Sequence, residues 1–242
     1  MKNPFRDKFE LSKKIGSWGI WFSRIAFILS IFSVIFENDF WVIALGILAV
    51  LMFLTDIVKG QILSMANRQR IDDLIDNSFE KNFGESRSEG YYTNETTTCG
   101  IERLAVNIFE SCFYSKRILE DVRCKTWIWA IGMTILIIVI ACMGLQTILC
   151  IIFQASFPIL LLINAVQSEM LISKLSDIES DYRKIYNNSN DNCRMAGLMS
   201  CVLKYENAMA TYKALLSESS YKKLNKKLNE EWNSLKKKYN LE

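Results

Sequence analysis

The stretch TWIWAIGMTILIIVIACMGLQTILCIIFQASFPILLLINAVQS, residues 126–168, decides the fold because it contains no Asp, Glu, Lys or Arg. It is 43 residues long, whereas one membrane crossing needs roughly 20 residues. A soluble helix of this length would need a polar face, which the stretch lacks. We expect two transmembrane helices, at about 126–145 and 147–167, joined by a tight turn near Gly144.

A second pair of apolar segments precedes this stretch. Residues 18–36 and 40–58 are separated only by Glu37, Asn38 and Asp39. The first of them follows a charged arm and has no small-x-small cleavage site, so we expect it to stay in place as a membrane anchor. The sequence therefore predicts an all-α integral membrane protein with two transmembrane helical hairpins, which make four crossings.

The basic residues predict the orientation of these hairpins. All 29 Lys and Arg except Arg24 fall before the first crossing, between the second and third, or after the fourth. Loops rich in Lys and Arg stay in the cytoplasm. We expect both termini and the central segment to be cytoplasmic. Tryptophans fall at the headgroup boundaries that this orientation requires: Trp18, Trp21, Trp41, Trp127 and Trp129.

The cytoplasmic parts have helical periodicity and predict a helical bundle built from extensions of the membrane helices, followed by a C-terminal helical tail. Crossing two continues to about Gly84, residues 84–100 form a loop, and a helix of 101–124 leads into crossing three. Crossing four continues with a heptad seam. The seam consists of Leu171, Leu175, Ile178, Tyr182 and Ile185.

Two further helices are expected after the seam. A break at 187–192 separates the first of them from the seam helix, and a break at Ser217–Ser220 separates the second from the first. The first carries an apolar stripe of Leu198, Val202, Tyr205, Met209, Tyr212 and Leu216. The last carries Tyr221, Leu224, Leu228, Trp232, Leu235 and Tyr239 on one face. The terminal pair Leu241-Glu242 is typical of a cloning remnant, and no role is assigned to it.

These elements divide the chain into five segments. They are a basic cytoplasmic arm (1–17), transmembrane hairpin 1 (18–58), cytoplasmic helices and loop (59–125), transmembrane hairpin 2 (126–167) and the cytoplasmic helical tail (168–242).

The composition gives no indication of enzyme chemistry. The chain has no histidine and no GxSxG, GxxxxGK[ST] or HExxH motif. Seven scattered cysteines without a CxxC pair favour reduced thiols rather than a zinc site or a disulfide framework. A net charge of +3 is too small to predict a nucleic acid polymer as partner. We expect no catalytic residues, no cofactor and no metal.

Polar residues at membrane depth are costly and therefore indicate function. Gln154, Asn164, Gln167 and Ser168 on crossing four are candidate pore-lining residues. The alternative is that Asn164 and Gln167 contact headgroups or neighbouring helices near the inner interface. Pro158 is expected to kink the same helix, because proline removes a backbone hydrogen bond.

Charged side chains stand near the cytoplasmic ends of two crossings and in the tail. Arg24 and Asp56 are expected at similar depth. They either form an ion pair or extend separately to the interface, and we favour separate extension. Four lysines of the last helix are candidates for contact with a ligand or with anionic lipid: Lys222, Lys223, Lys226 and Lys227. A solvated face without a partner is the commoner explanation for such runs.

The layout resembles the SMODS-associated four-transmembrane effectors of bacterial nucleotidyltransferase-based (CBASS-like) antiphage systems. The local similarities are RQRIDDLIDNSFEKNFG (68–84) after crossing two and SKLSDIESDYRKIYN (173–187) after crossing four. The resemblance implies an antiviral pore-forming effector of the bacterial inner (plasma) membrane that acts by abortive infection. A cyclic nucleotide signal, or a protein partner that senses it, would change the assembly of a homo-oligomer, which then permeabilises or depolarises the membrane. The alternatives are a non-conducting membrane adaptor and a small constitutive channel component.

Overall fold

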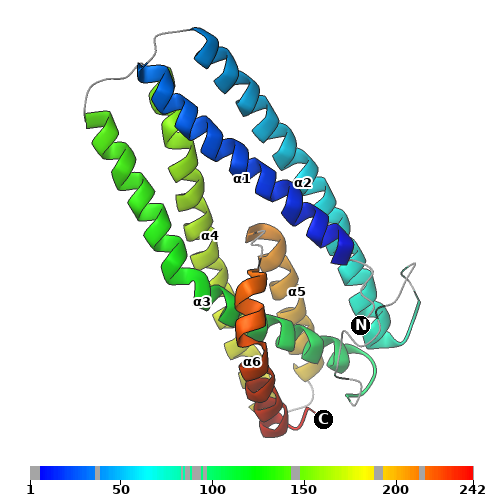
Figure 1. The fold of residues 1–242 in the computed structure, drawn as a ribbon. Coiled ribbons are helices and arrows are strands. Elements are labelled where there is room, and N and C mark those ends of the chain that lie inside the picture. The colour runs from blue at the N-terminus through cyan, green and yellow to red at the C-terminus, as the bar shows by residue number, and fades with distance from the viewer. Residues whose placement is uncertain are drawn as a thin grey trace. The chain divides into compact units, whose positions relative to one another are not determined.

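A computed structural model describes residues 6–35, 39–82, 84, 88, 94, 97–142, 148–187, 193–212 and 216–241. These residues form six α-helices and no strand (Figure 1). The helices are α1 (Arg6–Ile35), α2 (Asp39–Phe79), α3 (Ile101–Cys142), α4 (Ile148–Asn187), α5 (Arg194–Tyr212) and α6 (Glu218–Tyr239). The expectation of an all-α chain is confirmed.

Helices α1 to α4 are each long and apolar enough to cross a membrane. Only 6–22% of the residues in their most apolar windows are buried within the chain. A helix in water buries its apolar stripe against a core, whereas these helices leave large apolar side chains on the surface. The prediction of four membrane-span-like helices is confirmed, and the orientation of the termini stays a prediction.

Three of these helices are about twice as long as the membrane requires. Helices α2, α3 and α4 have 41, 42 and 40 residues, or about 60 Å at 1.5 Å per residue. The chain divides into two compact units, and each of these helices contributes to both. We call Phe5–Arg68 with Lys125–Ala165 the membrane unit and Gln69–Cys124 with Val166–Glu242 the helical bundle.

Small side chains join α1 to α2 in the membrane unit. The Ser23 hydroxyl donates to the Met52 sulfur at 3.1 Å. A Cβ atom added at Gly19 would lie 3.2 Å from the Thr55 hydroxyl oxygen, so the two helices approach closely there. The small residues recur at alternating spacings of four and three: Ser12, Gly16, Gly19, Ser23, Ala26 and Ser30. This seam holds the first hairpin together by close backbone packing.

The N-terminal half of α3 occupies the centre of the helical bundle. The Phe109 ring stacks on Tyr182 with centroids 4.8 Å apart and meets Trp232 edge-on at 5.2 Å. Side chains from α4, α5 and α6 therefore share one core around the N-terminal half of α3. Figure 1 shows α5 and α6 beside the N-terminal half of α3 and the C-terminal half of α4. Four residues of the expected heptad seam are buried: Leu171, Leu175, Ile178 and Tyr182.

Helix boundaries differ from expectation at two places. Residues 6–17 of the basic arm are the first turns of α1, and Ser12 is fully buried. The expected break at Ser217–Ser220 is shorter, because α6 begins at Glu218. The Ser217 hydroxyl accepts a hydrogen bond from the Ser220 backbone N–H at 3.3 Å and caps the helix. Serine is a favoured cap residue, so this run starts a helix.

The end of the chain is part of the bundle core. Leu241 is 5% exposed, and its carbonyl oxygen accepts a hydrogen bond from the Thr97 hydroxyl at 2.9 Å. Asn240 adopts the left-handed conformation, with φ 51°, and ends α6. This conformation turns the chain back onto the core, so Leu241 has a structural role that the sequence did not suggest.

Candidate functional site

The structure places the candidate pore-lining residues on α4. Asn164 is exposed on the surface of the single chain, and Gln167 and Ser168 are half-buried. The side chain of Gln154 lies outside the described residues, although its backbone is helical. Pro158 is buried inside α4. The pore-lining role and the kink stay predictions.

Arg24 and Asp56 are both exposed in the membrane unit. The contact of Ser23 with Met52 puts Arg24 about five residues from the level of Asp56, or about 7.5 Å along the helix axis. The ion pairs of the described residues do not include one between them. The Arg24 guanidinium lies 5.5 Å from the Trp21 ring centroid, towards the N-terminus of α1. This geometry fits separate extension of the two side chains.

Three of the four candidate lysines on α6 are paired with carboxylates. Lys223 donates to Asp121 on α3 at 2.7 Å, which lowers the pKa of that carboxyl. The other two pairs lie within α6 and are Lys222 with Glu218 at 2.8 Å and Lys227 with Glu231 at 3.7 Å. The charges of these three lysines are therefore balanced locally, and contact with lipid or ligand stays a prediction.

A buried ionic contact joins α3 to α4 inside the bundle. Glu179 is 4% exposed and accepts hydrogen bonds from Lys116 at 2.9 Å and from Arg183. Burial alone would raise the pKa of Glu179, but the hydrogen bonds from Lys116 and Arg183 outweigh it and lower the pKa. The carboxylate is therefore held charged between the two helices.

Polar contacts anchor the loop between α2 and α3. The Asp73 carboxylate accepts hydrogen bonds from the Ser88 backbone N–H and hydroxyl, both at 2.6 Å. The Asn94 amide donates to Glu110 at 2.7 Å. Burial raises the pKa of Glu110. These carboxylates hold the chain in place, and Tyr91 and Tyr92 lie outside the described residues.

The five cysteines whose side chains the structure describes are either exposed or buried. Cys99, Cys124 and Cys193 are exposed and unbridged. Cys112 and Cys201 are buried, and burial raises the pKa of Cys201 to about 11. Within the described ranges, no group of three or more His, Cys, Asp or Glu residues has the arrangement of a metal site.

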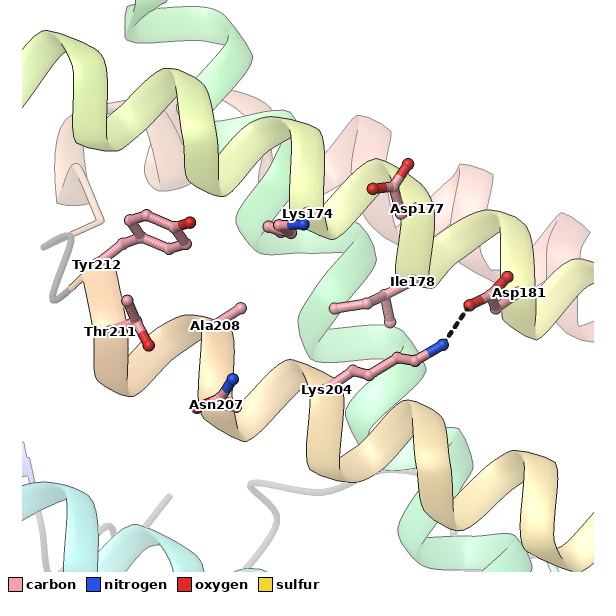
Figure 2. A pocket seen from close by; sticks show the side chains of 9 residues that line it. All are labelled: Lys174, Asp177, Ile178, Asp181, Lys204, Asn207, Ala208, Thr211 and Tyr212. Carbon is pink, nitrogen blue, oxygen red and sulfur yellow. Dashed lines mark hydrogen bonds and ion pairs between the residues drawn. The ribbon is translucent and has the colours of Figure 1, made fainter.

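A groove of about 380 Å³ lies between α4 and α5 (Figure 2). Buried Ile178 and Ala208 form its apolar floor, and its other lining residues are polar or aromatic. Its lining residues are Lys174, Asp177, Ile178, Asp181, Lys204, Asn207, Ala208, Thr211 and Tyr212. The sequence did not predict this site, although Lys174, Asp177 and Asp181 form the polar border of the heptad seam.

Of the two lysines that line the groove, one forms an ion pair and the other does not. Lys204 donates to Asp181 at 2.8 Å. This contact lowers the pKa of Asp181 and raises the pKa of Lys204. Lys174 has no hydrogen-bond or ion-pair partner among the described residues. The groove therefore offers a free ammonium group beside neutral hydrogen-bonding side chains.

No family model matches this chain. No curated protein and no solved structure matches it either. The resemblance to the four-transmembrane effectors stays a prediction from the sequence, and the function has to be argued from the structure.

Proposed function

We propose that this chain is a bacterial inner-membrane effector that assembles into a homo-oligomer and permeabilises or depolarises the membrane when it is triggered from the cytoplasmic side. Growth arrest or cell death would follow. One observation carries the proposal most: α2, α3 and α4 pass from the helical bundle into the membrane unit without a break.

Continuous helices give the bundle a direct way to act on the membrane unit. Repacking around the Glu179 contact would shift α3 against α4, and both helices continue into the membrane unit. Switching proteins commonly use small shifts of packed helices between two arrangements. A signal that binds one arrangement better would change its population.

The surface of the membrane unit supports assembly of several copies. Its large apolar side chains face outwards, as lipid requires, but Asn164 is exposed among them. Polar side chains on membrane helices commonly contact polar side chains of a neighbouring helix. Contact of Asn164 with a second copy would give a homo-oligomer, and a closed ring would surround a pore.

The trigger is part of the proposal and is supported by the resemblance of segment layout alone. That resemblance implies phage infection as the stimulus and a cyclic nucleotide, or a protein that senses it, as the messenger. The helical bundle is large enough to receive either, since its core draws on five helices.

The oligomeric state in native lipid tests this proposal. The mass of the full chain extracted with its surrounding lipid should show a discrete assembly of three or more copies. Asn164→Leu should shift this population towards smaller species. Thr134→Val is the matched control, because the Thr134 hydroxyl already donates to the Ala130 carbonyl in its own helix at 2.8 Å. A monomer or dimer in every variant would contradict the pore and favour the adaptor.

A further inference from the structure

The groove between α4 and α5 begins close to the expected membrane surface. Lys174 stands six residues after Ser168, where the uncharged stretch ends, which is about 9 Å along a helix. Headgroups extend about 5–8 Å beyond the hydrocarbon on each side. The Lys174 side chain is long enough to bridge the remaining distance.

The membrane-proximal end of the groove is also its donor-rich end. Figure 2 shows Thr211 and Tyr212 on α5 beside Lys174, whereas Lys204 and Asp181 meet at the other end. Asp177 points away from α5 in the same view. Lys174, Thr211 and Tyr212 thus provide an ammonium group and two hydroxyl groups. Asn207 adds an amide on the same wall.

These groups suit a phosphate ester. An ammonium group that forms no other ion pair gives a charge-assisted hydrogen bond to a phosphate oxygen, and the hydroxyl and amide groups donate to the remaining oxygens. The apolar floor of Ile178 and Ala208 suits the glycerol carbons beside the phosphate. Two carboxylates line the groove. Asp181 is paired with Lys204, and Asp177 points away from α5 (Figure 2).

We infer that this groove binds the headgroup of an anionic phospholipid, with Lys174 as the principal contact to its phosphate. The position favours a lipid over a soluble phosphate ester, because the donors gather at the end nearest the expected headgroups. A tyrosine at this level is typical of membrane interfaces. The inference concerns lipid binding by the bundle and does not require that the chain form a pore.

Short-chain probes test the site on the full chain purified in detergent. Dihexanoyl phosphatidylglycerol, added below its micelle concentration, should bind and raise the apparent Tm. Dihexanoyl phosphatidylcholine and glycerol 3-phosphate should bind more weakly. Lys174→Gln should weaken phosphatidylglycerol binding about tenfold, as expected for loss of one charge-assisted hydrogen bond. Asn207→Leu, which changes no charge, should weaken it a few-fold.

Lys81→Gln is the matched control, since it removes one positive charge from an exposed position of the bundle that lies outside the groove and outside the lysines of α6. Unchanged binding in Lys81→Gln together with loss in Lys174→Gln would support the site. Equal binding by wild type, Lys174→Gln and Asn207→Leu would overturn it, provided circular dichroism shows that the variants are folded. If glycerol 3-phosphate binds as tightly as phosphatidylglycerol, the ligand is a soluble phosphate ester, and the inference that the groove binds a lipid is wrong.

Discussion

The membrane unit and the helical bundle use apolar side chains in opposite ways. In α1, the buried positions are small, such as Ala26 and Ser30, while Trp21 is 59% exposed. In the bundle, the buried positions are large, such as Tyr182 and Trp232. Water drives apolar side chains into a core, whereas lipid tails solvate them and leave close packing of small residues to join helices. The difference shows which solvent each unit is built for.

Helix α4 changes from one pattern to the other within a few residues. Ile163 and Val166 are 48% and 44% exposed, whereas Leu171 and Leu175 are fully buried. The change falls at the end of the uncharged stretch, at Ser168. We infer that the boundary between lipid and water crosses α4 between Val166 and Leu171.

The largest expected effect comes from truncating a core leucine of the bundle. Leu175→Ala should cost about 2–5 kcal/mol, because it removes a fully buried side chain and leaves a cavity. Ile163→Ala, on the lipid-exposed part of the same helix, should change stability much less. The apparent Tm of each variant in detergent measures the difference. Equal decreases in Tm for the two variants would contradict the claim that large apolar side chains stabilise the bundle more than the membrane unit.

An intermediate effect is expected for the ionic contact in the bundle. Glu179→Ala leaves the largely buried Lys116 without its carboxylate partner and should lower the free energy of unfolding by about 2 kcal/mol. The loss should be smaller than for a fully buried ion pair, because Arg183 is partly exposed. The lowered pKa of Glu179 means that its contribution is present above the unfolded-state pKa and is lost as pH falls through the folded-state pKa.

The pH dependence of Tm separates this contact from general destabilisation. The Tm of wild type should fall between about pH 5 and 3 more steeply than that of Glu179→Gln, which has no carboxyl group to titrate at this position. Parallel pH profiles of the two proteins would show that Glu179 makes no such contribution.

The smallest of the three effects is expected in the α1–α2 seam. Gly19→Leu should cost about 1 kcal/mol, since a Cβ atom there already lies 3.2 Å from the Thr55 hydroxyl oxygen. Gly46→Leu on α2 is the control, because nothing lies within 4 Å of a Cβ atom at that position. Thermal unfolding in detergent should distinguish them. A larger loss for Gly46→Leu would show that small residues do not set the helix spacing.

Much of the fold could be predicted because its signals are local. The uncharged stretch of 126–168 predicts two long helices, and the heptad seam predicts which face of α4 is buried in the bundle. The seam of small residues in α1 was equally periodic, but hydropathy gives little weight to Ser and Gly. The pattern of apolar residues therefore does not indicate this seam.

Features that depend on pairing between distant segments could not be predicted. The groove exists because α5 packs beside α4, and sequence periodicity does not specify that pairing. Tyr221 lies on the expected apolar face of α6 yet is 43% exposed. Periodicity predicts which face of α6 is apolar. The helices that pack against α6 determine which residues of that face are buried.

Membrane potential in living bacteria tests the proposed function most directly. Cells that express the chain would be challenged with phage, beside cells that express Asn164→Leu or Thr134→Val. The proposed function predicts depolarisation and growth arrest after infection in wild type and Thr134→Val, and a weaker response in Asn164→Leu. An unchanged potential in infected cells whose membranes contain the protein would contradict a gated pore.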